Sequence, residues 1–446
     1  MDYIITGGTI VNEGKLDRRD LYIHQGRIAQ ESTALENPER VDATGCYVMP
    51  GIIDTHVHFR DPGFPEKADF ASESRAALKG GVTSVIDMPN TDPQTTSLQA
   101  LQAKEQIAER KSVVNYGFML GATNDNINDL LQIPADRYAA IKLFLGSSTG
   151  NMLVNNAQAL DLLFGESKKL VVAHCENEDI IQANLRNYKL EFAGTEKESA
   201  DLHPKIRNTE ACFVSTYKAV ERARKYGTRL HVAHVSTATE LSLFSNRVPA
   251  EKNITAEVTP NHLWFDERDY AQLGNLIKCN PAIKSSDDRI GLWGGLADGV
   301  IDTIATDHAP HTWQSKQKRY FEAPGGIPSI QHSLQMMLEC FFHPAATQQS
   351  DYNALLEEWL PLIVAKMCHN PATIFGICER GFLRPGYMAD VTIVEPSSEQ
   401  VTHESLLYKC GWSPLEGQTF HTRIKQVFLN GRPAGQSKAM QLKFDR

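Results

Sequence analysis

Short apolar runs alternate with longer amphipathic segments through the middle of this 446-residue chain. The spacing of apolar residues predicts helices over residues 97–110 and 209–226. Continuous apolar runs between helices are typical of parallel strands that are buried on both faces. Eight such strands over about 250 residues indicate an α/β fold of the (β/α)8, or TIM-barrel, type, and a doubly wound open sheet is the alternative. The predicted strands span residues 52–58, 84–88, 113–120, 140–145, 170–174, 230–234, 254–259 and 303–307.

Both ends of the chain are rich in short strands separated by turns. Gly7-Gly8 and Asn430-Gly431 are turn signals, and Asn-Gly is typical of tight hairpins. We therefore expect residues 1–50 and 385–446 to form one small composite β-sandwich domain beside a barrel domain of residues 51–384. The predicted terminal strands span residues 3–5, 9–11, 20–24, 27–29, 389–394 and 424–429.

Composition is that of an ordinary soluble protein, with 41% hydrophobic and 22% charged residues. A formal net charge of −9 disfavours a general surface for nucleic acid or anionic membrane. No basic leader precedes an apolar core, and no apolar run approaches the ~20 residues of a membrane span. The eight cysteines form no C-x-x-C pair. We expect a cytoplasmic protein with reduced thiols that acts on a small molecule.

Potential metal ligands recur at the ends of the predicted strands. His56 and His58 stand two apart on a strand, so both imidazoles point to the same face and can hold one metal ion between them. A lone histidine is usually a core or surface group, but independent histidines have no reason to choose the same end of successive strands. Imidazole and carboxylate suit zinc, with manganese or cobalt as substitutes. The set that ends its strands in this way is His56, His58, Lys142, His174, His234 and Asp307.

Arg60 lies two residues beyond His58, on the same face as both histidines. A planar guanidinium there could bind a substrate carboxylate through two parallel hydrogen bonds. The alternative is an ordinary surface arginine in a salt bridge, which its place beside the histidine pair disfavours.

Three motifs are similar to those of dihydroorotases in the amidohydrolase superfamily: Asp54 to Gly63, Asp87 to Thr91, and Ala305 to His311 followed by Lys316. The resemblance extends over essentially the whole chain. It implies that His56, His58 and Asp307 bind one zinc ion and that His174 and His234 bind a second. It also implies that hydroxide and a carboxylated Lys142 bridge the two ions.

The lysine needs carboxylation to act as a ligand, because an ammonium beside two dications is repelled. Burial would favour the neutral amine that reacts with CO2. The alternative for Lys142 is a solvated or salt-bridged lysine at a strand end.

The same resemblance implies the substrate site. Arg60, Asn90 and His311 correspond to residues that bind the carboxylate of dihydroorotate, although Asn90 could instead cap a turn and His311 could lie in an exposed loop. Gly325, and less strongly Asn280, would face the substrate ring. The segment from Gly146 to Gly150 is either a lid over the site or a simple loop before a helix.

The activity implied is the reversible, zinc-dependent hydrolysis of L-dihydroorotate to N-carbamoyl-L-aspartate in pyrimidine synthesis, with Asp307 as the catalytic acid and base. Alternatives are an allantoinase, a hydantoinase or dihydropyrimidinase, and an inactive scaffold for aspartate transcarbamoylase. Scaffold homologues typically lose metal ligands, whereas every proposed ligand position here is filled. The resemblance also implies a homodimer and leaves open an association with aspartate transcarbamoylase.

Overall fold

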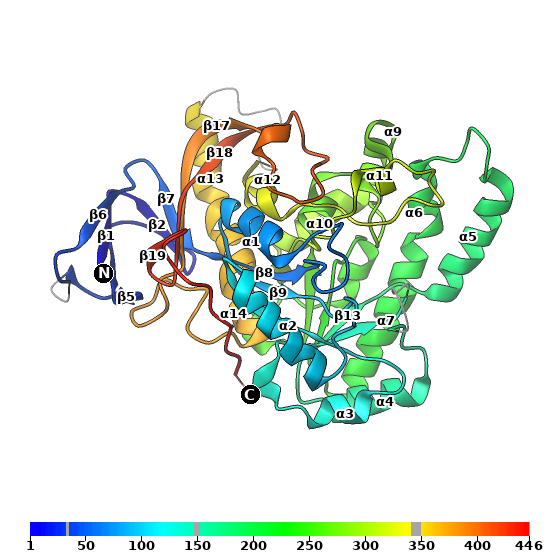
Figure 1. The fold of residues 1–446 in the computed structure, drawn as a ribbon. Coiled ribbons are helices and arrows are strands. Elements are labelled where there is room, and N and C mark those ends of the chain that lie inside the picture. The colour runs from blue at the N-terminus through cyan, green and yellow to red at the C-terminus, as the bar shows by residue number, and fades with distance from the viewer. Residues whose placement is uncertain (33–34, 147–151, 340–348, 446) are drawn as a thin grey trace.

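The computed structural model of the chain describes residues 1–32, 35–146, 152–339 and 349–445. It has a mixed α/β architecture in which strands and helices alternate through the middle of the sequence (Figure 1). Apart from Gly146, the predicted lid lies outside the described residues. None of the described helices is long and apolar enough to cross a membrane. The seven cysteines in the described parts of the chain are free thiols.

The parallel strands predicted from the apolar runs are present in the predicted order. They form two sheets, and within each sheet every strand pairs in parallel with the next one along the chain. One sheet contains β8 (Ile52–Val57), β9 (Val82–Asp87) and β10 (Asn115–Phe118), and the other contains β11 (Leu120–Gly121), β12 (Ile141–Phe144), β13 (Val171–His174), β14 (Leu230–Val232), β15 (Ile254–Val258) and β16 (Thr303–Ile304).

The two parallel sheets are joined at two places, between β10 and β11 and between the segment after β16 and the end of β8. Only Met119 separates β10 from β11, and its N–H donates to the carbonyl of Asp87 at 3.2 Å. Beyond β16, a parallel bridge links His308 to Val57, and the N–H of His58 donates to the carbonyl of His308 at 2.8 Å. The hydrogen bonding therefore returns from the last strand to the first.

Helices cover the strands on the outside, so the strands are buried on both faces, as their apolar runs predict (Figure 1). The predicted helix over residues 209–226 begins where Asn208 Oδ1 accepts the N–H of Ala211 at 2.9 Å and ends at Gly227, whose φ is +72°. The α-helices are α1 (Phe70–Lys79), α2 (Leu98–Lys111), α3 (Ile127–Gln132), α4 (Ala157–Glu166), α5 (Glu178–Phe192), α6 (His203–Ile206), α7 (Thr209–Tyr226), α8 (Pro260–Trp264), α9 (Tyr270–Leu273), α10 (Ser286–Ala297), α11 (Trp313–Lys316), α12 (Ser333–Glu339), α13 (Gln349–Val364) and α14 (Asn370–Phe375).

The two ends of the chain contribute strands to one sheet (Figure 1). In it β7 of the N-terminal part pairs antiparallel with β17 of the C-terminal part. The sheet order is β19 (Arg432–Pro433), β18 (Thr419–Leu429), β17 (Val391–Gln400), β7 (Tyr47–Pro50), β2 (Thr9–Asn12) and β3 (Lys15–Arg18). A second sheet has the order β5 (Arg27–Ala29), β4 (Leu21–His24), β1 (Tyr3–Thr6) and β6 (Glu39–Asp42).

An apolar core separate from that of the parallel strands holds these two sheets together. Tyr3 and Ile23 of the smaller sheet pack in it with Val48, Ile393 and Phe428 of the larger one. At the hairpin between β18 and β19, Asn430 and Gly431 both have positive φ, at 51° and 79°, as a tight Asn-Gly turn requires.

The C-terminal residues return to the parallel strands. Gln441 forms a parallel bridge with Tyr116, and Leu442 and Phe444 pack with Ile53 and Ile86 in a further apolar cluster. The end of the chain therefore packs against the parallel strands.

A buried ion pair between Arg380 and Asp390 lies where the chain enters the C-terminal sheet, and its loss should destabilise the fold. Asp390 accepts the backbone N–H of Asn430 at 2.7 Å and the Asn115 amide at 3.3 Å, and it pairs with Arg380. Both charged residues are no more than 5% exposed. The substitution Arg380→Met leaves the carboxylate buried without its cation, so we expect the free energy of unfolding to fall by about 3–5 kcal/mol. Urea denaturation measures this change.

Arg19→Met is the matched control, because Arg19 pairs with Asp17 at 2.9 Å in an exposed position. That change should cost less than about 1 kcal/mol. Equal, small losses in the two variants would contradict a structural role for the buried pair.

Candidate metal centre and substrate pocket

A cavity of about 250 Å³ lies at the carboxyl ends of the parallel strands. Every site residue predicted from the sequence lines it, and their chemical roles remain predictions. These residues are His56, His58, Arg60, Asn90, Lys142, His174, His234, Asn280, Asp307, His311 and Gly325.

Three ligand atoms meet at the end of β8. The Nε2 atoms of His56 and His58 lie 3.2 Å and 2.9 Å from the same oxygen, Oδ1 of Asp307. On its other side, His56 donates from Nδ1 to Oε1 of Glu257 at 2.6 Å. A carboxylate on the far ring nitrogen is the usual partner of a metal-binding imidazole, because it fixes the ring and the tautomer.

His58 is neutral, and this leaves a lone pair of its ring directed at the carboxylate of Asp307. Its Nδ1 donates to Oδ1 of Asn90 at 2.8 Å. Burial lowers the pKa of His58 to about 4, so the ring is neutral at neutral pH. Its Nε2 then presents a lone pair to the carboxylate of Asp307 at 2.9 Å. Two acceptors this close repel each other unless a cation lies beside them, so the arrangement fits a metal ion.

A second pair of imidazoles lies next to the first. His174 donates from Nε2 to Glu176 at 3.0 Å, and its Nδ1 lies 2.9 Å from Nε2 of His234. Among the described residues, Nδ1 of His234 is buried without a hydrogen-bond partner. Burial holds the pKa of His234 well below its usual value, so this ring is also neutral.

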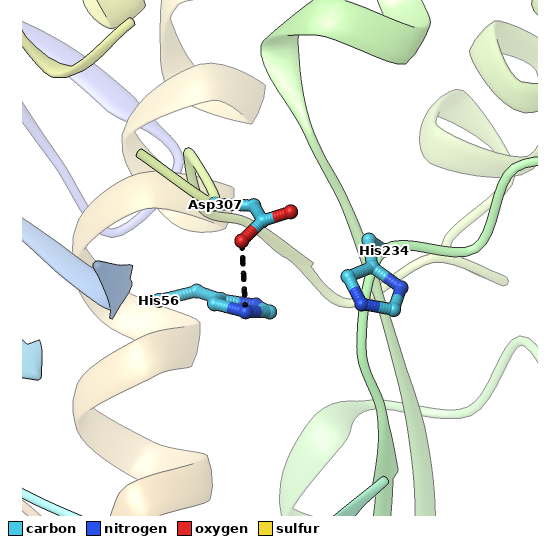
Figure 2. Close-up of side chains that lie close together, drawn as sticks. All are labelled: His56, His234 and Asp307. Carbon is cyan, nitrogen blue, oxygen red and sulfur yellow. Dashed lines mark ion pairs between the residues drawn. The ribbon is translucent and has the colours of Figure 1, made fainter. Parts of the chain in front are cut away.

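The two pairs are close enough to act together. Ligand atoms of His56, His234 and Asp307 all lie within 4.8 Å of one another. Figure 2 shows the two imidazoles and the carboxylate directed into the same space. The backbone is strained here, since His234 and Asp307 have φ values of 39° and 47°, which non-glycine residues seldom adopt. This geometry could hold a metal ion.

Lys142, on β12, extends into the same cavity. It is 1% exposed, and within the described part of the chain its Nζ has no hydrogen-bond partner. Burial lowers its pKa to about 8, against the opposing charges of Glu257 and Asp307. A buried amine without an acceptor is unfavourable, and carboxylation would replace it with an anionic carbamate whose oxygens could bind a metal ion. The donor set as a whole therefore fits divalent metal.

Donor groups for an anion occupy another part of the cavity. Arg60 has a φ of 64°, and its Nη2 lies 3.3 Å from Nε2 of His311. The preceding N–H, of Phe59, donates to Asp87 at 2.7 Å, which fixes the chain where it turns after β8. The carbonyl of His311 accepts the indole N–H of Trp412 at 2.7 Å.

The segment with Gly325 is held by a buried lysine. Nζ of Lys316 donates to the carbonyls of Lys278, Pro324 and Gly326 at 3.1, 3.1 and 2.9 Å. At Gly326 a side chain would be too close to the chain opposite, because a Cβ would lie 2.4 Å from the carbonyl of Ala309. Backbone groups therefore form this wall of the cavity.

Several residues of the site are absent from the predicted set. Glu257 interrupts an otherwise apolar strand, and Glu176 stands two residues after His174, so both had a signal in the sequence. Phe64 and Lys67 line the cavity from the connection between β8 and α1, where no periodicity marks them.

Comparison with known proteins identifies the family. Residues 47–434 match the model of the family described as Amidohydrolase family. The chain belongs to the amidohydrolase family. A dihydroorotase from Halobacterium salinarum is 34% identical over 403 residues, 90% of this amidohydrolase and 89% of the relative.

Other relatives include a further dihydroorotase and an allantoinase. A dihydroorotase from Lactobacillus johnsonii is 30% identical, covering 97% of this amidohydrolase and 98% of the relative. An allantoinase from Salmonella choleraesuis is 29% identical, covering 96% and 94%. The solved structure of an L-hydantoinase from Arthrobacter aurescens superposes with a TM-score of 0.87 at 24% identity, covering 99% of this chain and 98% of the other, which shows a common fold.

The buried carboxylate of Glu176 should make the metal-free amidohydrolase sensitive to acid. Burial alone would raise its pKa, but Arg207 and His174 hold the pKa well below the usual 4.5. Between the pKa of Glu176 in the folded state and about 4.5, the unfolded state binds the proton and the folded state does not. The stability that the ionised Glu176 contributes is therefore fully present above about pH 5 and is lost progressively as the pH falls below it. Glu176→Gln should reduce the free energy of unfolding by about 3 kcal/mol at neutral pH and make its dependence on pH shallower.

Urea denaturation in chelator, from about pH 3.5 to 7, measures both effects. Glu196→Gln, at an exposed position, is the control and should change neither quantity. An unchanged pH slope in the Glu176 variant would contradict the assignment.

Proposed function

We propose that this amidohydrolase is a dihydroorotase, which hydrolyses L-dihydroorotate reversibly to N-carbamoyl-L-aspartate in pyrimidine synthesis. The observation that supports this most is the contact of Arg60 with His311 in the same cavity as the converging imidazoles and carboxylate. To hydrolyse a cyclic amide that carries a carboxylate, a site must hold a hydrolytic centre and a cation no farther apart than the length of the substrate. Relatives named dihydroorotase at 30–34% identity support the same assignment.

We propose further that the parallel strands form a closed (β/α)8 barrel within residues 51–384, and that residues 1–50 and 385–446 form a composite β-sandwich. The hydrogen bond from His58 to His308 and the one-residue step between β10 and β11 support closure. The core shared by the two terminal sheets supports the sandwich.

The metal ligands in this proposal divide into two sets. His56, His58 and Asp307 would hold one zinc ion, and His174 and His234 would hold a second, with a carboxylated Lys142 between them. Bound zinc would supply a lowered pKa for water and a polarised amide carbonyl.

The chain's own residues then orient the substrate. The guanidinium of Arg60 binds the carboxylate. Because Asn90 accepts from His58 through its oxygen, its amino group is the part that can donate to the same carboxylate. His311 completes this group, while Asn280 and the backbone at Gly325 face the ring.

Asp307 moves the proton. Its carboxylate oxygen Oδ1 lies 3.2 Å from Nε2 of His56 and 2.9 Å from Nε2 of His58. It can accept a proton from the attacking water and deliver it to the departing ring nitrogen. Hydrolysis converts a monoanion into a dianion and releases a proton near neutral pH, so a lower pH favours ring closure, the biosynthetic direction.

An allantoinase is the second candidate, since such a relative matches almost the whole chain. Hydantoinase or dihydropyrimidinase activity is a third, and these alternatives act on rings without the carboxylate that Arg60 would bind. We also propose a cytoplasmic homodimer that can associate with aspartate transcarbamoylase, on the resemblance alone.

The metal-loaded protein should hydrolyse dihydroorotate and show little turnover of allantoin or dihydrouracil. Arg60→Ala should lower kcat/KM for dihydroorotate by about a hundredfold, because it removes a charged hydrogen-bond donor to the substrate. Its metal content, measured by elemental analysis, should not change.

Turnover of an uncharged ring without turnover of dihydroorotate would overturn the substrate assignment. Protein that binds no metal under replete conditions would instead support the inactive scaffold.

Lys142→Ala should lose bound metal or activity, and short carboxylic acids should restore part of the activity by replacing the carboxylate. Lys169→Ala is a matched control, because Lys169 is also a buried lysine with a pKa lowered by burial to about 8, but it lies outside the cavity. Full activity of Lys142→Ala without additives would exclude the lysine from the metal centre.

A further inference from the structure

A second cation, Lys67, lines the cavity beside Arg60 and has no part in the chemistry described above. It lies in the connection between β8 and α1, where its backbone N–H donates to the carbonyl of Phe64 at 3.0 Å. That turn brings both side chains to the cavity, and Nζ of Lys67 lies 4.3 Å from the centre of the Phe64 ring. The aromatic face favours a cation at this position.

The surroundings of Lys67 are electropositive. Burial lowers its pKa and the charge of Arg60 lowers it further, while the carboxylate of Glu66 opposes both effects. The pKa of His311 is held well below its usual value by burial and then by Arg60, Lys316 and Lys67. Throughout the described ranges, no ion pair joins Arg60 or Lys67 to a carboxylate, although Glu66 acts on both cations and Asp307 and Asp87 act on Arg60 from a greater distance. Two unpaired cations that face one cavity repel each other, and an anion bound between them would remove that repulsion.

We propose that Lys67 binds the substrate carboxylate together with Arg60 and thereby sets the preference for carboxylated over uncharged rings. This inference rests on the proposed function. A carboxylate offers four lone-pair positions on two oxygens, enough for the guanidinium, the ammonium and the Asn90 amide. Arg60 fixes the orientation through its planar fork, and Lys67 adds charge and a donor that a turn and an aromatic ring hold in place.

Lys67→Met tests the proposal through both turnover and binding. We expect kcat/KM for dihydroorotate to fall about tenfold to a hundredfold, mainly through KM. In calorimetry, orotate should bind more weakly by a similar factor, while uracil, the same ring without the carboxylate, should bind as it does to the unchanged protein. Lys67→Arg should retain most of the affinity for orotate, and the metal content should be unchanged in both variants.

Lys218→Met is the control for loss of one positive charge, because Lys218 is exposed on α7. It should change neither turnover nor binding. A change of less than about twofold in orotate affinity and kcat/KM for Lys67→Met would overturn the proposal, as would an equal loss for orotate and uracil, which would indicate a purely structural role.

The binding experiment separates this inference from the proposed function. If the unchanged protein failed to hydrolyse dihydroorotate, the proposed function would be wrong. The selective loss of orotate binding in Lys67→Met would still show whether Lys67 and Arg60 form a carboxylate site. If the methionine variant folded poorly, the comparison of Lys67→Arg with Lys67→Gln would replace it, with the glutamine variant expected to show the selective loss.

Discussion

The structure depends on holding several lone pairs, from four histidine rings and one carboxylate, close together in the buried cavity. His56 and His58 direct Nε2 atoms at one oxygen of Asp307, and the neutral His174 and His234 face each other a short distance away. Without a cation, such a cluster is electrostatically unfavourable, and its ligands would turn apart if they were free to do so. The protein prevents this because each ring is tied by its other nitrogen or lies at the end of a strand buried on both faces.

The ties come from distant parts of the chain. Glu257 holds His56 across 201 residues of sequence, and Glu176 is itself fixed by the buried Arg207. Trp412, from the segment between β17 and β18, donates to the carbonyl of His311. The C-terminal part of the chain therefore does more than complete the terminal sheets, because one of its side chains supports the part of the cavity where an anion would bind.

The charge of the cavity differs in sign from the net charge of the protein. The protein has a net charge of −9, yet its cavity contains Arg60 and Lys67 without a carboxylate partner in the described residues. A local positive region within an acidic protein favours a small anion over a polyanion, because a polyanion would also meet the negative surface. Metal ligands and cations share one cavity, so hydrolysis and recognition of a carboxylate can occur on the same small molecule.

The sequence by itself determined the order and place of the parallel strands and the residues at their ends, because continuous apolar runs identify strands buried on both faces and parallel strands bring their carboxyl ends together. The sequence also predicted that Arg60 lies beside His56 and His58, but the reason given was wrong, because the strand ends at Val57 and a turn with a positive φ at Arg60 brings the guanidinium to the cavity. Only the tertiary structure decided which groups hold those side chains. Glu257 is visible in the sequence as a charge within a buried strand, but its contact with His56 is not. Trp412 and Lys67 reach the site through a contact between segments far apart in sequence and through an irregular connection, which leave no periodic pattern.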